Sequence, residues 1–178
     1  MIDKTICFTG HRPNKLGGYD ENNPIAKYVK EQLNAEILNA ILYGGYTRFI
    51  AGGALGVDTW AAEEVLYFRD EVGLDITLEL FAPFEGQEVK WFEESKKRYF
   101  SIMERCNKVV NVCEPGYAAW KMIVRDKAMV DESGLVMAVW NGDLGRSGTG
   151  HTVEYAKKMK RDMIIIDPRF YNATITLG

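Results

Sequence analysis

Six short apolar runs alternate with segments of helical periodicity along this sequence. The runs are rich in β-branched and aromatic residues, which favour strands, and glycine or proline marks most of their boundaries. This alternation predicts an α/β fold, a three-layer sandwich of a mostly parallel sheet with helices on both faces. The expected strands cover residues 5–9, 47–51, 76–81, 109–112, 135–140 and 163–166, and the expected helices cover residues 24–41, 57–68, 89–105, 118–131 and 154–160.

The composition excludes several classes of protein. With 178 residues, 47% of them apolar, the chain is expected to form one domain over residues 1–178. Its 22 basic and 25 acidic residues give a formal charge of −3, which makes a nucleic-acid partner unlikely. The longest apolar run, Leu135–Trp140, is far shorter than the roughly 20 residues of a membrane span. Because the first residues also resemble no secretory signal, we expect a cytoplasmic protein without a membrane partner.

Cysteine and histidine are too few and too widely spaced for a typical zinc site. The sequence contains Cys7, Cys106 and Cys113 and only two histidines, His11 and His151. A structural zinc site usually requires four such ligands in close pairs. We therefore predict no metal and no cofactor, and we expect free cysteines in a reducing compartment.

The loop between the second strand and its helix contains three glycines within five residues. Ligands of parallel sheets bind beyond the carboxyl ends of the strands. Glycines there allow backbone N–H groups at a helix N-terminus to approach an anion. The loop matches neither common phosphate-binding glycine motif, and a tight turn with an acidic capping residue is the structural alternative. Its candidate ligand-binding residues are Gly52, Gly53, Ala54, Gly56 and Asp58.

A second glycine-rich loop, residues 141–150, follows the fifth strand. Two such loops exceed what sheet packing requires and together favour a phosphate-bearing ligand. Glu154 is expected in the first turn of the next helix, where a carboxylate also stabilises the helix dipole, so a structural role remains open. The candidate residues here are Gly148, Thr149, Gly150, His151 and Glu154.

Two further places carry candidate cations. Gly10, His11 and Arg12 directly follow the first strand, at the ligand-binding end of the sheet. Arg125 shares an apolar helical face with Met122 and Met129. An arginine in that position either extends to the edge of the face or contacts an anion, and the spacing leaves both open.

Three motifs together resemble the YpsA-like family of bacteria and their phages. They are GHRP at residues 10–13 with KLGGY at residues 15–19, GGALGVD at residues 52–58, and SGTGHTVE at residues 147–154. That family belongs to the SLOG superfamily, which includes DNA-processing protein A and the cytokinin-activating phosphoribohydrolases. The resemblance covers nearly the whole chain. It implies a Rossmann-like fold, a nucleotide or nucleotide-derived ligand, and a homo-oligomer.

The resemblance also suggests an enzymatic alternative. In the phosphoribohydrolases a PGGxGTxxE segment binds the ribose phosphate and supplies a catalytic glutamate, and an arginine lies on the preceding helix. Here Gly150 and Glu154 keep that spacing and Arg125 resembles the arginine, but His151 replaces the threonine and the PGG opening is absent. If the protein is an enzyme, the resemblance implies that Glu154 and Arg125 are catalytic.

Three hypotheses follow for the function. The first is binding or sensing of a nucleotide or a nucleotide derivative such as an ADP-ribose-like molecule. The second is hydrolysis of the N-glycosidic bond of a nucleotide. The third, which the negative net charge disfavours, is a DNA-binding module.

Overall fold

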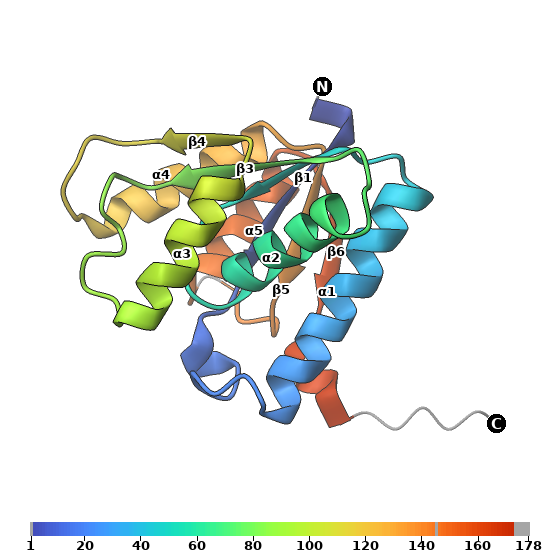
Figure 1. Ribbon diagram of the computed structural model, residues 1–178, viewed down its shortest axis with the longest axis horizontal. Coiled ribbons are helices and arrows are strands. Elements are labelled where there is room, and N and C mark those ends of the chain that lie inside the picture. Colours follow the sequence, from blue (N-terminus) through green and yellow to red (C-terminus); the bar gives the residue numbers. More distant parts are fainter. Residues whose placement is uncertain (1, 145, 173–178) are drawn as a thin grey trace.

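The computed structural model describes residues 2–144 and 146–172 and contains one six-stranded, fully parallel sheet (Figure 1). The strand order is β4-β3-β2-β1-β5-β6. The strands are β1 (Thr5–Gly10), β2 (Arg48–Ala51), β3 (Thr77–Ala82), β4 (Lys108–Asn111), β5 (Leu135–Val139) and β6 (Asp162–Ile166). The predicted α/β, Rossmann-like architecture is confirmed.

Helices cover both faces of the sheet. The described helices are α1 (Pro24–Leu42), α2 (Val57–Asp70), α3 (Glu93–Arg105), α4 (Ala119–Asp131) and α5 (Gly148–Lys158), with short 3-10 turns at Ile2–Lys4, Pro13–Lys15 and Pro168–Asn172. Alternate strand residues point to opposite faces. Ile6 and Phe8 therefore pack with α1, α2 and α3, whereas Cys7 packs with α4 and α5.

Two helices begin at positions that the sequence pattern did not give. Helix α3 begins at Glu93, four residues after the expected start, because turns such as the one from Gly86 to Val89 precede it. Helix α5 begins at Gly148, six residues before the expected start, because the Ser147 side chain accepts a hydrogen bond from the Gly150 amide and caps it. Residues 148–151 are thus helical and do not form a loop.

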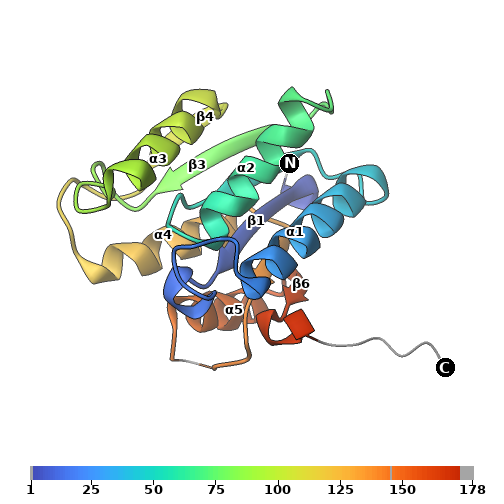
Figure 2. The same ribbon diagram turned by 60° about the horizontal axis from the view of Figure 1, so that its bottom comes forward.

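The strand order reverses between β1 and β5. From β1 the chain adds β2, β3 and β4 on one side, and it then returns to add β5 and β6 on the other. The segments that leave β1 and β5 diverge at such a point and open a crevice beyond the strand ends. Figure 2 shows the segment after β1 and the start of α5 at this same end of the molecule. None of the helices in the described part of the chain has the length and apolar character needed to cross a membrane.

Candidate functional site

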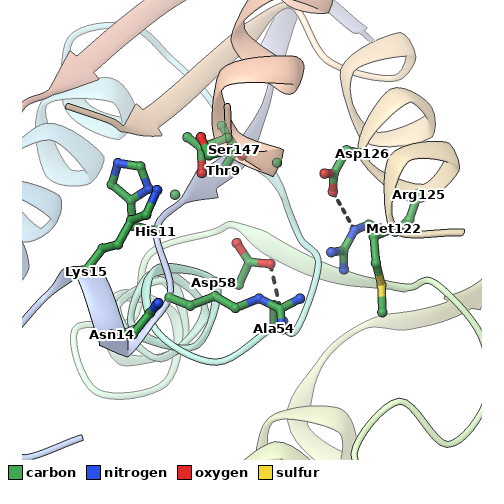
Figure 3. A pocket seen from close by; sticks show the side chains of 14 residues that line it. Thr9, His11, Asn14, Lys15, Ala54, Asp58, Met122, Arg125, Asp126 and Ser147 are labelled. Carbon is green, nitrogen blue, oxygen red and sulfur yellow. Dashed lines mark hydrogen bonds and ion pairs between the residues drawn. The ribbon is translucent and has the colours of Figure 1, made fainter. Parts of the chain in front are cut away.

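A pocket of about 230 Å³ lies beyond the carboxyl ends of the strands at this switch point (Figure 3). It joins four segments: the end of β1 with the turn after it, the start of α2 with its preceding loop, α4, and the start of α5. The lining residues are Thr9, Gly10, His11, Arg12, Asn14, Lys15, Ala54, Asp58, Met122, Arg125, Asp126, Ser147, Gly148 and Thr149.

Arg125 is buried at this pocket, with 4% of its surface exposed. Its Nε donates a hydrogen bond to Oδ1 of Asp126 at 2.7 Å, and its Nη1 donates to the carbonyl oxygens of Gly52 and Phe81. Among the described residues, its second terminal nitrogen, Nη2, has no hydrogen-bond partner. The guanidinium therefore does not extend to the edge of the helix face. It connects α4 to the ends of β2 and β3 and keeps one nitrogen for another acceptor.

Asp58 is a buried carboxyl group in the first turn of α2. It accepts a hydrogen bond from the Ala54 amide at 3.2 Å. Burial raises the pKa of Asp58 from 3.8 to about 6, and the negative charge of Asp126 adds to this rise. The positive charges of Arg125 and Arg12 oppose it. Asp58 therefore titrates close to neutral pH.

His11 connects the segments that leave β1 and β5. Its Nε2 accepts a hydrogen bond from the Asn141 amide at 3.2 Å, so this nitrogen carries no proton. Burial, together with the nearby positive charge of Lys15, lowers the pKa of His11 below 6.5. The imidazole is accordingly neutral at pH 7 and positions the two segments.

The start of α5 presents backbone amides to the pocket. The first turn of a helix has N–H groups without carbonyl partners in the helix and carries a partial positive charge. Gly148 and Thr149 belong to this turn and line the pocket. Lys15, paired with Asp143 at 3.0 Å, and Arg12 add positive charge at the same place. This arrangement is suited to an anion.

Three candidate ligand-binding glycines of the loop before α2, Gly52, Gly53 and Gly56, do not line the pocket, whereas Ala54 and Asp58 do. A Cβ at Gly52 would lie 2.6 Å from Cζ of Arg125, so this glycine makes room for the guanidinium. Gly53 has a φ of +73°, and a Cβ there would lie 2.8 Å from the ring of Tyr99. Gly56, with a φ of +89°, lies against the His11 carbonyl just before α2. In this structure the three glycines allow close packing and backbone conformations that a side chain would hinder, and a ligand-binding role for them stays a prediction.

Three candidates on α5 are also outside the pocket lining. Gly150 is buried within the helix, and its amide is used by the Ser147 cap. His151 is exposed and lines a shallow depression beside Ile123 and Tyr155. Glu154 is exposed in the second turn of α5, because the helix begins six residues earlier than expected.

The pocket contains several residues that the sequence analysis did not select. Lys15 and Ser147 lie inside the quoted motifs, and Asp126 directly follows Arg125, so proximity to chosen residues was the available signal. The missed lining residues are Thr9, Asn14, Lys15, Met122, Asp126 and Ser147. In the described part of the chain, no three histidine, cysteine or carboxylate side chains gather as a metal site would require.

The fold and the pocket define a Rossmann-like α/β domain with a candidate ligand site at its switch point. The model of the YpsA family, described as the YspA SLOG family, matches residues 6–169. The chain belongs to this family.

Curated relatives extend over most of the chain. A UPF0398 protein of Halalkalibacterium halodurans is 29% identical over 170 residues, which cover 93% of this chain and 88% of the relative. A UPF0398 protein of Bacillus anthracis is 30% identical over 156 residues, with 87% and 83% covered.

Two solved structures of DNA processing protein A share the fold. The Helicobacter pylori protein, described for its single-stranded DNA binding mode, has a TM-score of 0.60 at 17% identity, with 92% of this chain and 65% of that chain covered. The Streptococcus pneumoniae protein has a TM-score of 0.61 at 18% identity, with 98% and 52% covered. The present chain thus spans about half to two thirds of these larger chains.

Proposed function

We propose that this protein binds a nucleotide or a nucleotide-derived ligand in the pocket beyond β1 and β5, with a phosphate group at the N-terminus of α5. The observation that carries the proposal is Arg125. Its Nη2 has no hydrogen-bond partner among the described residues and is not a sealed, unsatisfied atom, so it is open to donate to a ligand. Arg125 also lines the same pocket as Gly148 and Thr149 at the start of α5.

The other groups in the pocket complement such a ligand. Arg12 and Lys15 supply further positive charge, while the carboxylates of Asp58 and Asp126 are acceptors for hydroxyl or amino groups. A volume of about 230 Å³ is below the range typical of complete small-molecule sites. We therefore expect the pocket to hold the phosphate and sugar, with the rest of the ligand extending outward.

The test begins with the ligand that accompanies the native protein. Mass spectrometry after denaturation would identify it, and calorimetric titration with AMP, ADP-ribose and NAD would follow. Arg12→Gln should weaken the affinity about tenfold or more, the scale of a charge-assisted hydrogen bond. Arg105→Gln, which alters an arginine paired with Asp70 at the far end of α3, is the matched control and should leave the affinity unchanged. The absence of a bound nucleotide and of any titration signal would refute the proposal.

The hydrolase alternative receives no support from Glu154, since this exposed side chain lies outside the pocket lining. The carboxyl groups that line the pocket are Asp58 and Asp126. Prolonged incubation with AMP, followed by chromatography for free adenine, tests for turnover. Should adenine appear, Glu154→Gln is expected to retain the activity.

Single-stranded DNA is a second candidate, favoured by the fold shared with the Helicobacter pylori protein described as binding it. Arg12 and Lys15 would then contact backbone phosphates. Fluorescence anisotropy with a labelled oligonucleotide at several salt concentrations tests this, since phosphate contacts make affinity fall steeply with salt. Competition by ADP-ribose would place the DNA in the same pocket.

A further inference from the structure

We propose that anion binding in this pocket is coupled to the uptake of one proton by Asp58. This inference rests on the proposed function, because it assigns a protonation event to the same pocket. Figure 3 shows Asp58 of α2 and the pair Arg125 and Asp126 of α4 around one cavity.

The charged and titratable groups around Asp58 come from three segments. Helix α4 contributes Arg125, which attracts the carboxylate, and Asp126, which repels it. The turn after β1 contributes Arg12, which also attracts it. The thiol of Cys7 on β1 is close enough for the charge of Asp58 to act on it. With both carboxyl groups ionised, the two arginines and the two aspartates balance to no net charge.

A bound anion would disturb this balance. An anion at the start of α5 that also contacts Nη2 of Arg125 adds negative charge beside two carboxylates in a buried site. A further negative charge close to two carboxylates favours protonation of one of the two carboxylates. The group that gains the proton is the one whose ionised form is least stabilised.

Asp58 is that group. In the described part of the chain its carboxylate accepts one hydrogen bond, from the Ala54 amide, and forms no ion pair within 4 Å. Asp126 accepts hydrogen bonds from Arg125 and from the Thr152 hydroxyl, and its side chain is 21% exposed. The pKa of Asp58, about 6 without a ligand, already lies close to neutral, so a modest further rise protonates it at pH 7.

The sign of the pH dependence follows from this. The anion binds the protonated form more tightly, so affinity falls as the pH rises above 6 and becomes constant at lower pH. Uptake of a single proton limits the slope to tenfold per pH unit. We expect a loss of about tenfold in affinity between pH 6 and pH 8.

The probe is inorganic sulfate, since its charge is constant over this range and a phosphate monoester would itself titrate. Calorimetry of the full chain at pH 6, 7 and 8 gives the affinity. Titrations at pH 7 in two buffers with different ionisation enthalpies give the number of protons taken up. Uptake of a substantial fraction of one proton per sulfate supports the inference.

Asp58→Asn keeps the acceptor for the Ala54 amide but cannot titrate. It should bind sulfate with a nearly constant affinity from pH 6 to 8 and take up no proton. Asp126→Asn is the matched control on the other side of Arg125: Asp58 can still take up a proton, so a pH dependence should remain, displaced to lower pH because the charge of Asp126 no longer repels the Asp58 carboxylate. His11 also lines the pocket, and a slope that survives in Asp58→Asn would assign the proton to His11 or another group and overturn the inference.

The remaining outcomes separate the two proposals. Sulfate binding with no pH dependence and no proton uptake in the unmodified protein overturns the role of Asp58 and leaves the anion site in place. No sulfate binding at any pH overturns both. If Asp58→Asn does not fold, the proton uptake of the unmodified protein decides alone.

Discussion

Arg125 combines a structural role with a place in the proposed ligand site. Its apolar neighbours on α4 alone would favour methionine at this position. The hydrogen bonds to Asp126, Gly52 and Phe81 reverse that expectation, because Arg125→Met removes the ion pair of Asp126 and the donor that connects the Gly52 and Phe81 carbonyls to α4. Breaking a fully buried pair costs about 3–5 kcal/mol, and we expect less here because the Asp126 side chain is 21% exposed.

We therefore predict that Arg125→Met lowers the free energy of unfolding by a few kcal/mol and weakens nucleotide affinity as well. Urea unfolding and calorimetry on Arg125→Met and Arg125→Lys give the two quantities. The lysine variant should recover only part of both, since a point charge cannot replace the planar fork. An affinity equal to that of the parent in Arg125→Met would restrict Arg125 to a structural role.

Asp58 should destabilise the ligand-free protein at neutral pH. Its pKa is raised from 3.8 to about 6 on folding, so the folded state binds more protons than the unfolded chain between these values. The penalty is fully present above pH 6 and disappears as the pH falls toward 3.8. Asp58→Asn should raise the free energy of unfolding by about 1–3 kcal/mol at pH 7.5, and by less than half of that at pH 4.5. Urea titrations at the two pH values check this, and an equal gain at both would contradict it.

Gly53 is now expected to matter for stability, not primarily for the ligand. A Cβ there would lie 2.8 Å from the Tyr99 ring and 2.9 Å from Leu80, at a φ of +73°. Gly53→Ala should cost about 2–4 kcal/mol, since strain and overpacking add. Gly73→Ala is the matched control, because Gly73 has a φ of +83° but nothing within 4 Å of the added carbon. Thermal unfolding that shows equal losses in both variants would contradict this account.

At the scale of elements, α5 links helix capping to the ligand site. Ser147 caps α5, and Asn23 caps α1 by the same kind of hydrogen bond, in which Asn23 Oδ1 accepts from the Ala26 amide. Ser147→Ala and Asn23→Ala should each lower the free energy of unfolding by about 1 kcal/mol. Only Ser147→Ala should also weaken nucleotide binding, because only Ser147 lines the pocket. Calorimetry measures the nucleotide affinity of both variants. Equal affinities would show that the Ser147 cap does not contribute to ligand binding.

The pattern of apolar runs predicted the elements well and the site less well. All six strands and the interior helices follow from local periodicity, which depends on neighbouring residues along the chain. The exposure of Glu154 depends on where α5 starts. The direction of Gly53 depends on which side chains pack around its loop at the end of the sheet. The Ser147 cap sets the start of α5. A glycine-rich segment does not reveal from its sequence whether its last residues are helical. Asp126 was not predicted as a site residue, because only the fold shows that it lies near Asp58.

At the scale of the whole molecule, α4 exposes an apolar surface. Trp120, Ile123 and Val124 are 58%, 40% and 39% exposed and follow helical spacing on its outer side. Aromatic side chains such as that of Trp120 are enriched at protein interfaces. We predict a homodimer that uses this surface. Light scattering at micromolar concentration should show about twice the mass of the chain, and Trp120→Glu should shift it toward the monomer. A monomer in the unmodified protein would contradict the prediction.

The contact between Gly52 and Arg125 also has an evolutionary consequence. A side chain at position 52 and a full-length arginine at position 125 would occupy the same space, because a Cβ there would lie 2.6 Å from Cζ of Arg125 and 2.7 Å from Oδ2 of Asp58. Substitutions at these three positions are therefore not independent. Within the YpsA family, we expect a side chain at position 52 only in lineages where both the arginine and the aspartate have changed. Positions 52 and 125 should then change together with position 58 across the family tree, although 73 positions separate Gly52 from Arg125 in the sequence.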